Sequence, residues 1–185
     1  MKWILPVVLL AMAFPAMAMD ARNPGEKLLG IRLETPDSGK VQEYLGLAAK
    51  PSFTMDDLDA DVAVVEVFSM YCPHCQREAP SINRFYDLLV KRKNPGTSIK
   101  LIGIGVGNSQ FEVDYFRKTY DVPFPLFADG DFVVHRALGE VRTPYFIVLA
   151  REEDRSWRVV MSRPGGIESP EAFLTTIVEL TKGEN

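Results

Sequence analysis

Both cysteines of the 185-residue chain lie in one four-residue stretch, Cys72-Pro73-His74-Cys75. A disulfide between them would close a very short loop, and the stabilisation that a disulfide gives to a fold grows with the length of the loop. A purely structural bridge is therefore a weak interpretation of this pair. The spacing instead indicates redox chemistry, in which the two sulfurs alternate between dithiol and disulfide.

A helix is expected to begin at Cys72, because an apolar strand pattern precedes it and an amphipathic segment follows it. The unpaired N–H groups and partial positive charge of a helix N-terminus favour a thiolate. A free thiol titrates near ~8.5, and such positions lower this to roughly 3.5–7.5. Pro73 suits the first helical turn, and the His74 imidazole is expected to stabilise the thiolate. Cys72 is predicted to be the attacking sulfur and Cys75 the buried, resolving sulfur.

Stabilising the Cys72 thiolate stabilises the reduced form, so the Pro-His pair favours disulfide donation. Metal binding is an alternative use of these residues, but zinc needs about four ligands. The cysteine and histidine ligands in the chain are only Cys72, Cys75, His74 and His135. His135 falls in a predicted short helix and is interpreted as a surface or packing residue. We predict no metal and no organic cofactor, only a redox-active disulfide between Cys72 and Cys75.

The first 18 residues have the pattern of a secretory signal peptide. Lys2 supplies a positive charge, residues 3–14 are almost wholly apolar, and Ala16-Met17-Ala18 has the small-x-small pattern of a cleavage site. The apolar run is shorter than the ~20 residues of a membrane span. We therefore expect export with cleavage near Ala18, and an uncleaved anchor is the alternative.

The remaining sequence alternates between strand and helix patterns. Buried strands are predicted at 62–68, 99–106 and 145–149, and shorter strands at 28–33, 124–127 and 157–161. Helices are predicted at 76–93, 109–120, 131–138 and from Ser169-Pro170 onwards. Residues 41–47 are ambiguous between strand and irregular structure, and residues 52–61 are expected to hold a helical turn capped by Thr54. The alternation indicates an α/β sandwich with a mixed sheet.

The formal net charge is −4 and there is no basic tract, so nucleic acid is excluded as the expected partner.

The motif and its surroundings resemble the thioredoxin superfamily over about residues 55–182. Glu66, six residues before Cys72, stands where the family keeps an acidic residue that assists proton transfer at the second cysteine. The resemblance implies a thioredoxin-like three-layer sandwich with a mixed central sheet. The implied catalytic residues are Cys72, Cys75, His74 and Glu66.

Further positions carry the same resemblance. Thr143-Pro144 is similar to the family's cis-proline element, which implies that it faces the cysteines and pairs with substrate backbone. Pro80 matches the proline inside the active-site helix, and Gly165-Gly166 resembles the glycines that close the final hairpin. The implied substrate-binding residues are Thr143, Pro144, Pro73 and Tyr71.

Different parts of the chain resemble two different subgroups of the superfamily. Residues 68–75, Phe-Ser-Met-Tyr-Cys-Pro-His-Cys, are very similar to the active site of the DsbA proteins, disulfide donors of the bacterial periplasm. The interval from Cys75 to Pro144 is too short for the helical insertion of DsbA and fits the strand-and-helix insertion of the TlpA and ResA group. Residues 124–129 and 139–144 also resemble that group. We therefore expect a TlpA-like scaffold that carries a DsbA-like dipeptide.

The resemblance implies a periplasmic protein thiol–disulfide oxidoreductase, favoured slightly as a disulfide donor. The alternative is a TlpA/ResA-like thiol reductase, for example in cytochrome c maturation. A peroxidase is disfavoured because no Pro followed by Thr or Ser precedes Cys72 at the required offsets, and a non-catalytic thioredoxin-fold binding module is a further alternative. The expected partners are cysteine-containing exported proteins and a membrane redox partner, either a quinone-linked oxidase or a transmembrane electron donor.

The predicted organisation has three parts: a signal peptide at 1–18, an N-terminal extension packed on the domain at 19–54, and a thioredoxin-like domain at 55–185.

Overall fold

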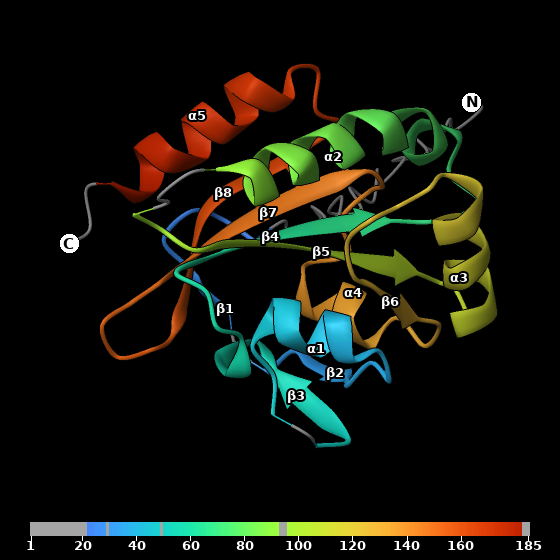
Figure 1. Ribbon diagram of the computed structural model, residues 1–185, viewed down its shortest axis with the longest axis horizontal. Helices are drawn as coiled ribbons and strands as arrows, with labels where there is room; N and C mark the ends of the chain where they lie inside the picture. Colours follow the sequence, from blue (N-terminus) through green and yellow to red (C-terminus); the bar gives the residue numbers. More distant parts are fainter. Residues whose placement is uncertain (1–21, 29, 49, 93–95, 183–185) are drawn as a thin grey trace, which may run out of the picture.

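A computed structural model of the chain describes residues 22–28, 30–48, 50–92 and 96–182. The predicted signal peptide with its cleavage site, and residues 94 and 95 of the predicted turn, lie outside these residues. Within the described part, six strands form one mixed sheet in the order β1-β8-β7-β4-β5-β6. Helices cover both faces of the sheet (Figure 1), so the predicted three-layer thioredoxin-like sandwich is confirmed.

The strands of this sheet are β1 (Lys27–Leu28), β4 (Val62–Phe68), β5 (Ile99–Val106), β6 (Leu126–Asp129), β7 (Tyr145–Arg151) and β8 (Trp157–Pro164). The helices are α1 (Gly39–Leu45), α2 (Pro73–Lys91), α3 (Gln110–Thr119), α4 (Val133–Ala137) and α5 (Pro170–Thr181), with a 3-10 turn, η1 (Met55–Asp57). Two further strands, β2 (Arg32–Glu34) and β3 (Ser52–Thr54), pair with each other.

Strand β4 is the centre of the molecule and is buried along its whole length. It runs parallel to β5 and antiparallel to β7. Its side chains alternate between two core clusters, as a strand covered on both faces requires. Val64 and Phe68 lie in the cluster shared with α2, α3 and α5, whereas Val65 and Val67 lie in the cluster shared with α1, η1 and α4. The alternation directs Glu66 toward the α2 face.

The predicted strands at 62–68 and 99–106 are confirmed, and so is the helical turn capped by Thr54. The undecided segment 41–47 is mostly helical, because α1 buries Leu45 completely against the sheet. The predicted strand at 124–127 is displaced to β6, since Pro125 has no N–H to donate to a ladder. The predicted strand at 28–33 divides into β1 and β2 around Gly30, which has a φ of +81°.

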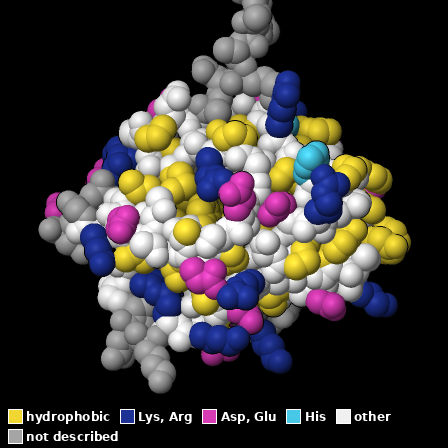
Figure 2. Space-filling model, turned by 90° about the horizontal axis from the view of Figure 1, so that it is seen from above, with side chains coloured by type: hydrophobic (Ala, Val, Ile, Leu, Met, Phe, Trp, Pro, Cys, Tyr) yellow, Lys and Arg dark blue, Asp and Glu magenta, His cyan; other side chains and the backbone are white. Residues whose placement is uncertain are grey.

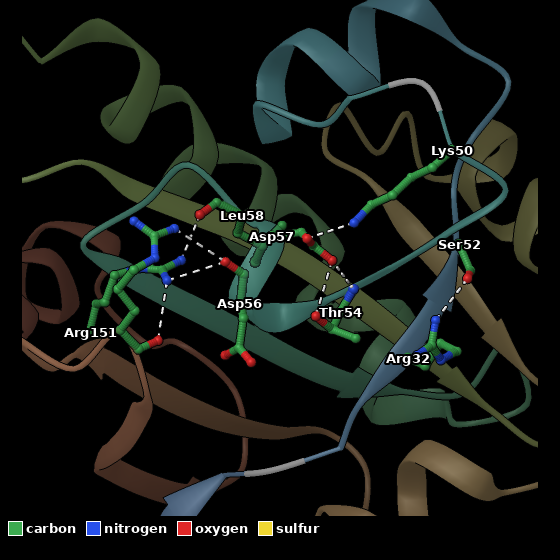
Figure 3. A network of polar contacts seen from close by, with 9 residues as sticks. Arg32, Lys50, Ser52, Thr54, Asp56, Asp57, Leu58 and Arg151 are labelled. Carbon is green, nitrogen blue, oxygen red and sulfur yellow. Dashed lines mark hydrogen bonds and ion pairs between the residues drawn. The ribbon is translucent and has the colours of Figure 1, made fainter.

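Arg151, the last residue of β7, holds the loop between η1 and β4 in place by hydrogen bonds. Its guanidinium donates hydrogen bonds to the carbonyls of Ala60 at 2.8 Å, Leu58 at 2.6 Å and Asp56 at 3.3 Å. It also lies 4.2 Å from the centre of the Trp157 ring. Figure 3 shows the hydrogen bonds from Arg151 to Leu58 and Asp56.

The same view shows how η1 is closed. The Asp57 carboxylate accepts a hydrogen bond from the Thr54 N–H at 2.7 Å and forms an ion pair with Lys50 at 2.6 Å. The interaction with Lys50 has the largest effect on this carboxyl. Together with the hydrogen bonds from Thr54, it lowers the pKa of Asp57 to about 2. The turn before β4 is therefore fixed by side chains at both of its ends.

Arg151→Lys is expected to lower the free energy of unfolding by about 2 kcal/mol, because a lysine leaves carbonyls of this loop without donors. Denaturant unfolding measures the change. Arg155→Lys is the matched control, since within the described part of the chain the Arg155 side chain donates only to the Asp56 carbonyl, at 3.5 Å. A change below about 0.5 kcal/mol is expected there. Equal losses in the two variants would contradict this role of Arg151.

Helix α1 and strands β2 and β3, which belong to the predicted N-terminal extension, lie below the sheet in Figure 1. Their apolar side chains Leu33, Leu45 and Phe53 enter the core cluster beneath β4 and β5. The boundary that separates this extension from the domain stays a prediction. Among the described helices, none combines the length and the apolar character that crossing a membrane requires.

The extension also completes the hydrogen bonding of β5. Strand β6 pairs with β5 only from Gly103 onwards, which leaves Leu101 without a strand neighbour on that side. The hydroxyl of Tyr44, from α1, accepts a hydrogen bond from the Leu101 N–H at 2.8 Å and donates one to the Leu101 carbonyl at 3.5 Å. The amino group of Lys100 lies 4.7 Å from the centre of the same ring.

Candidate active site

Cys72 is the N-cap residue of α2, and Pro73 is the first residue of that helix. The Cys75 N–H donates a hydrogen bond to the Cys72 Sγ, with N and S 3.4 Å apart. Cys72 is half-buried, whereas Cys75 is fully buried one turn further into the helix, and both are free thiols. The predicted helix start at Cys72 is confirmed, and the two sulfurs differ in access as the sequence indicates.

The two thiols differ in acidity as well. Partial burial raises the pKa of Cys72, but hydrogen bonding by the Thr143 side chain, by Cys75 and by the His74 backbone together outweighs burial, so the net pKa is lowered. Burial raises the pKa of Cys75 far above its ordinary value, and the charges of Cys72 and Glu66 add to that effect. Cys72 is therefore the sulfur that ionises first and is open to attack.

The predicted proline element faces Cys72. The Thr143–Pro144 peptide bond is cis, and the Cys72 thiol donates a hydrogen bond to the Thr143 carbonyl, with S and O 3.4 Å apart. The Pro144 carbonyl accepts a hydrogen bond from the Gly165 N–H at 3.0 Å. The structure thus brings Thr143, Pro144 and Gly165 to the cysteine site from two separate loops.

Glu66 is 2% exposed and lies on β4 beneath α2. Burial, followed by the nearby charge of Glu78, raises the pKa of Glu66 to about 8. Within the described residues, no group forms a hydrogen bond with its carboxyl. Glu66 is therefore a buried acid that is mostly protonated at neutral pH and lies close enough to act electrostatically on Cys75.

Glu78 is a site residue that the sequence analysis did not find. Its carboxylate accepts a hydrogen bond from the Ile167 N–H at 3.0 Å. Gly166 makes room for it, because a β-carbon there would lie 1.9 Å from the Glu78 carboxyl carbon. Its spacing was an available signal, since a residue three positions after Cys75 lies on the same helix face.

Asn108 is a second residue that the sequence analysis missed. It is completely buried, its side-chain oxygen accepts a hydrogen bond from the Met70 N–H at 2.8 Å, and its amide donates to the Ser69 hydroxyl at 3.4 Å. From the other side, Gln76 donates to the Met70 carbonyl at 2.8 Å. Both backbone groups of Met70 are thus held by side chains, which fixes the loop that leads into Cys72.

Asn108→Ala is expected to lower the free energy of unfolding by about 2 kcal/mol, because the partly buried Met70 N–H loses its acceptor. Chemical denaturation of the reduced protein provides the measurement. Asn23→Ala is the matched control, since among the described residues the Asn23 side chain bonds only to Glu26, at the surface. A loss no greater than that of the control would show that Asn108 does not hold the loop.

His74 and Tyr71 both point to partners other than the sulfurs. The Arg77 guanidinium lies 2.9 Å from His74 Nδ1, and because arginine only donates, Nδ1 accepts that bond. The Tyr71 hydroxyl donates a short hydrogen bond to Glu112 at the start of α3. In this structure His74 acts on Cys72 through its backbone, so tuning by its ring stays a prediction, as do the substrate-binding roles of Tyr71 and Pro73.

His135 makes a contact beside the site that its interpretation from the sequence, as a surface or packing residue, does not include. Its Nε2 donates a hydrogen bond to the Val141 carbonyl at 2.8 Å, two residues before Thr143. It therefore ties α4 to the loop that carries the cis-proline. No local sequence pattern marks this contact, because it depends on how the loop folds back onto α4.

The described residues contain no group of three or more His, Cys, Asp and Glu side chains arranged to hold a metal ion. What they bring together is a sulfur whose pKa is lowered, a second and buried sulfur, a buried acid and a backbone carbonyl that faces the first sulfur. The sequence model of the AhpC/TSA family matches residues 17–165.

The chain belongs to the AhpC/TSA family.

Among curated proteins, the chain is 28% identical over 88 residues to sporulation thiol-disulfide oxidoreductase A of Bacillus subtilis. The match covers 46% of each chain, so it spans about half the length of that relative. The resemblance to the thioredoxin superfamily is thereby confirmed.

Two solved structures show that the AhpC/TSA chain shares its fold with thioredoxin-like proteins. The thioredoxin domain of a thiol-disulfide oxidoreductase from Bacteroides vulgatus superposes with a TM-score of 0.61 at 12% identity, covering 85% of this chain and 99% of that one. A secreted disulfide oxidoreductase of Mycobacterium tuberculosis, homologous to Escherichia coli DsbE, gives 0.55 at 17% identity, covering 71% and 90%.

Proposed function

We propose that the protein is a thiol–disulfide oxidoreductase that exchanges disulfides with cysteine-containing proteins outside the cytoplasm. The observation that carries the proposal is the Cys72 sulfur at a helix start, 3.4 Å from the Thr143 carbonyl, with the buried Cys75 one turn behind it. The similarity to sporulation thiol-disulfide oxidoreductase A supports the same reaction class.

The reaction is two successive thiol–disulfide exchanges. In the donating direction, a substrate thiolate attacks the Cys72 sulfur of the disulfide, and Cys75 leaves as a thiolate. A second substrate thiolate then attacks the substrate sulfur of the mixed disulfide, and Cys72 leaves. The protein disulfide is reduced to two thiols, and two substrate thiols are oxidised to one disulfide.

Glu66 fits the proton transfer in the first exchange. With a pKa of about 8 it carries its proton at neutral pH, and the Cys75 thiolate is the stronger base because its pKa is raised much further. The proton therefore moves from Glu66 to Cys75 as that sulfur leaves. In the reverse direction the Glu66 carboxylate removes the proton before Cys75 attacks.

Within this class, we infer that the protein donates disulfides. The hydrogen bonds that lower the pKa of Cys72 stabilise the reduced form, which makes the disulfide more oxidising. We expect a reduction potential above about −200 mV, measured by equilibration with glutathione. A value near or below the ~−270 mV of thioredoxin would instead support the thiol reductase, as in cytochrome c maturation.

The same preparation tests the other functions. A protein that neither oxidises a reduced peptide nor reduces insulin, and in which Cys72→Ala alters only binding, would be a binding module. Consumption of hydrogen peroxide faster than disulfide exchange would indicate a peroxidase. Either result would overturn the proposal.

We also propose a periplasmic location, a cleaved N-terminal signal peptide and a membrane redox partner that resets the Cys72–Cys75 pair. The secreted M. tuberculosis protein of similar fold supports the location. Fractionation of cells that express the full chain, with sequencing of its mature N-terminus, tests it. A cytoplasmic product that retains Met1 would contradict export.

A further inference from the structure

A hollow of about 560 Å³ lies beside the cysteine site and shares Thr143 with it. Its lining includes two buried valines, Val106 and Val141, and two exposed aromatic side chains, Tyr71 and Phe132. Hydrophobic side chains also gather along the right-hand side of Figure 2, the end at which α3 and the start of α2 lie in Figure 1. Apolar surface of this kind, left open to water, is typical of a binding site.

The backbone at the hollow is held in an unusual conformation. Four described residues other than glycine have a positive φ, and two of them, Phe132 and Glu140, line the hollow. Phe132 has a φ of +58° although its side chain is 43% exposed. Neither burial of its side chain nor the backbone preference of phenylalanine explains this residue type at position 132. Residues with such uncommon backbone angles cluster at functional sites.

Gly107 supports the placement of this ring. It has a φ of +64°, and a β-carbon at this position would lie 2.8 Å from the Phe132 ring. The ring therefore lies directly against the Gly107 backbone, at one side of the hollow. The chain thus fixes an exposed aromatic wall instead of leaving it to rotate freely.

The position of the hollow determines what can fill it. A substrate joined to Cys72 in a mixed disulfide must pass Thr143, whose carbonyl is 3.4 Å from the Cys72 sulfur. The substrate residues next to its cysteine then lie over the hollow. Its volume lies within the range of small-ligand sites, and its aromatic and valine lining suits an apolar group.

We propose that this hollow takes a bulky apolar side chain, above all an aromatic one, from an extended protein segment next to the cysteine that reacts with Cys72. The inference rests on the proposed function, because it names the substrate class of that reaction. It makes Phe132 and Val141 determinants of specificity. Folded proteins with buried cysteines are poorer substrates, since they cannot present an extended segment with this side chain.

The test uses a series of peptides that carry one cysteine in a disulfide with 5-thio-2-nitrobenzoate and have Phe in place of Ala at each flanking position in turn. The Cys72 thiolate attacks the peptide sulfur, and the thionitrobenzoate that leaves is followed by its absorbance. At one flanking position or more, we expect Phe to raise the second-order rate constant about tenfold, as partial burial of a phenylalanine allows. The same disulfide of free cysteine, which cannot fill the hollow, is the reference.

Phe132→Gly is the decisive variant, because glycine adopts a positive φ without strain and the fold is therefore expected to persist, as circular dichroism can verify. The variant should lose the preference for Phe. Phe111→Ala is the matched control, since Phe111 is 78% exposed on α3 and does not line the hollow; it should keep the preference.

The outcomes separate the two proposals. Equal rate constants for the Phe and Ala peptides with the wild-type protein would overturn the hollow as a specificity site while leaving the oxidoreductase intact. Persistence of the preference in Phe132→Gly, or its loss in Phe111→Ala, would also overturn the hollow. Absence of exchange with every disulfide, including that of free cysteine, would overturn the proposed function itself.

Discussion

We expect Cys72→Ser to lose disulfide exchange by at least about a thousandfold, the order of effect seen when a covalent nucleophile is removed. The hydroxyl that replaces the sulfur ionises far above neutral pH and cannot form a disulfide. Cys72 is the sulfur that solvent and the Thr143 carbonyl both reach, so no other group in the described chain takes over its role. Oxidation of a reduced peptide, followed by loss of its free thiols, measures the effect.

Cys75→Ser is the matched variant, and its expected defect is of a different kind. When the substrate carries a disulfide, Cys72 still attacks it and one substrate sulfur leaves as a thiolate, but the buried second sulfur that would release the substrate is missing. Mixed disulfides between Cys72 and substrate should therefore accumulate and be visible on non-reducing gels. Accumulation in Cys72→Ser in place of Cys75→Ser would reverse the assignment of the two sulfurs.

Glu66→Gln is expected to remove a large pH dependence of stability. The pKa of Glu66 is about 8 in the folded protein, against 4.5 as its ordinary value. Between these values the folded state holds a proton that the unfolded state has released, so the free energy of unfolding falls as pH rises. At ~1.4 kcal/mol per pKa unit, the loss from pH 4.5 to pH 8 is of the order of 4 kcal/mol.

The difference between the wild-type and Glu66→Gln unfolding curves isolates this group, because every other titration is common to both. The variant should match the wild type near pH 4.5 and be the more stable protein near pH 8. It should also resolve mixed disulfides roughly 100-fold more slowly, since general acid–base assistance is lost. Denaturant unfolding across this pH range, with stopped-flow exchange, supplies both measurements.

Glu171→Gln is the control for this experiment. The Arg84 ion pair holds the pKa of Glu171 below its ordinary value, so its titration affects stability only at lower pH. No change in slope between pH 4.5 and 8 is expected in this variant. A wild-type slope that survives in Glu66→Gln would show that the buried carboxyl is not its origin.

The parts of the fold that sequence analysis predicted correctly are those with a strong local signal. The apolar runs of β4 and β5 have the β-branched composition of strands covered on both faces. The start of α5 follows from Ser169 as cap and Pro170 as first residue. Helix α1 has only seven residues and begins at Gly39, so its stability comes from the contact of Leu45 with the sheet and not from propensity.

The site residues also divide into those with a strong local signal in the sequence and those without one. Cys72 and Cys75 are evident from spacing alone, whereas the cis bond at Pro144 came only through family resemblance, because cis is found in ~5–6% of such bonds. Asn108 and His135 act through contacts with Met70 and Val141 that depend on tertiary structure. The side-chain ring of His74 shows the limit of a motif, since its neighbour Arg77 determines how the ring is used.

The contact between Tyr44 and Leu101 has a consequence for how the protein behaves in a crowded compartment. A strand margin with free N–H and C=O groups is a template on which a foreign chain can add, and this leads to aggregation. One phenol hydroxyl occupies both backbone groups of Leu101, at the part of β5 that lies before the start of β6. The Tyr44 hydroxyl therefore reduces the chance that a foreign chain adds to β5 at this position.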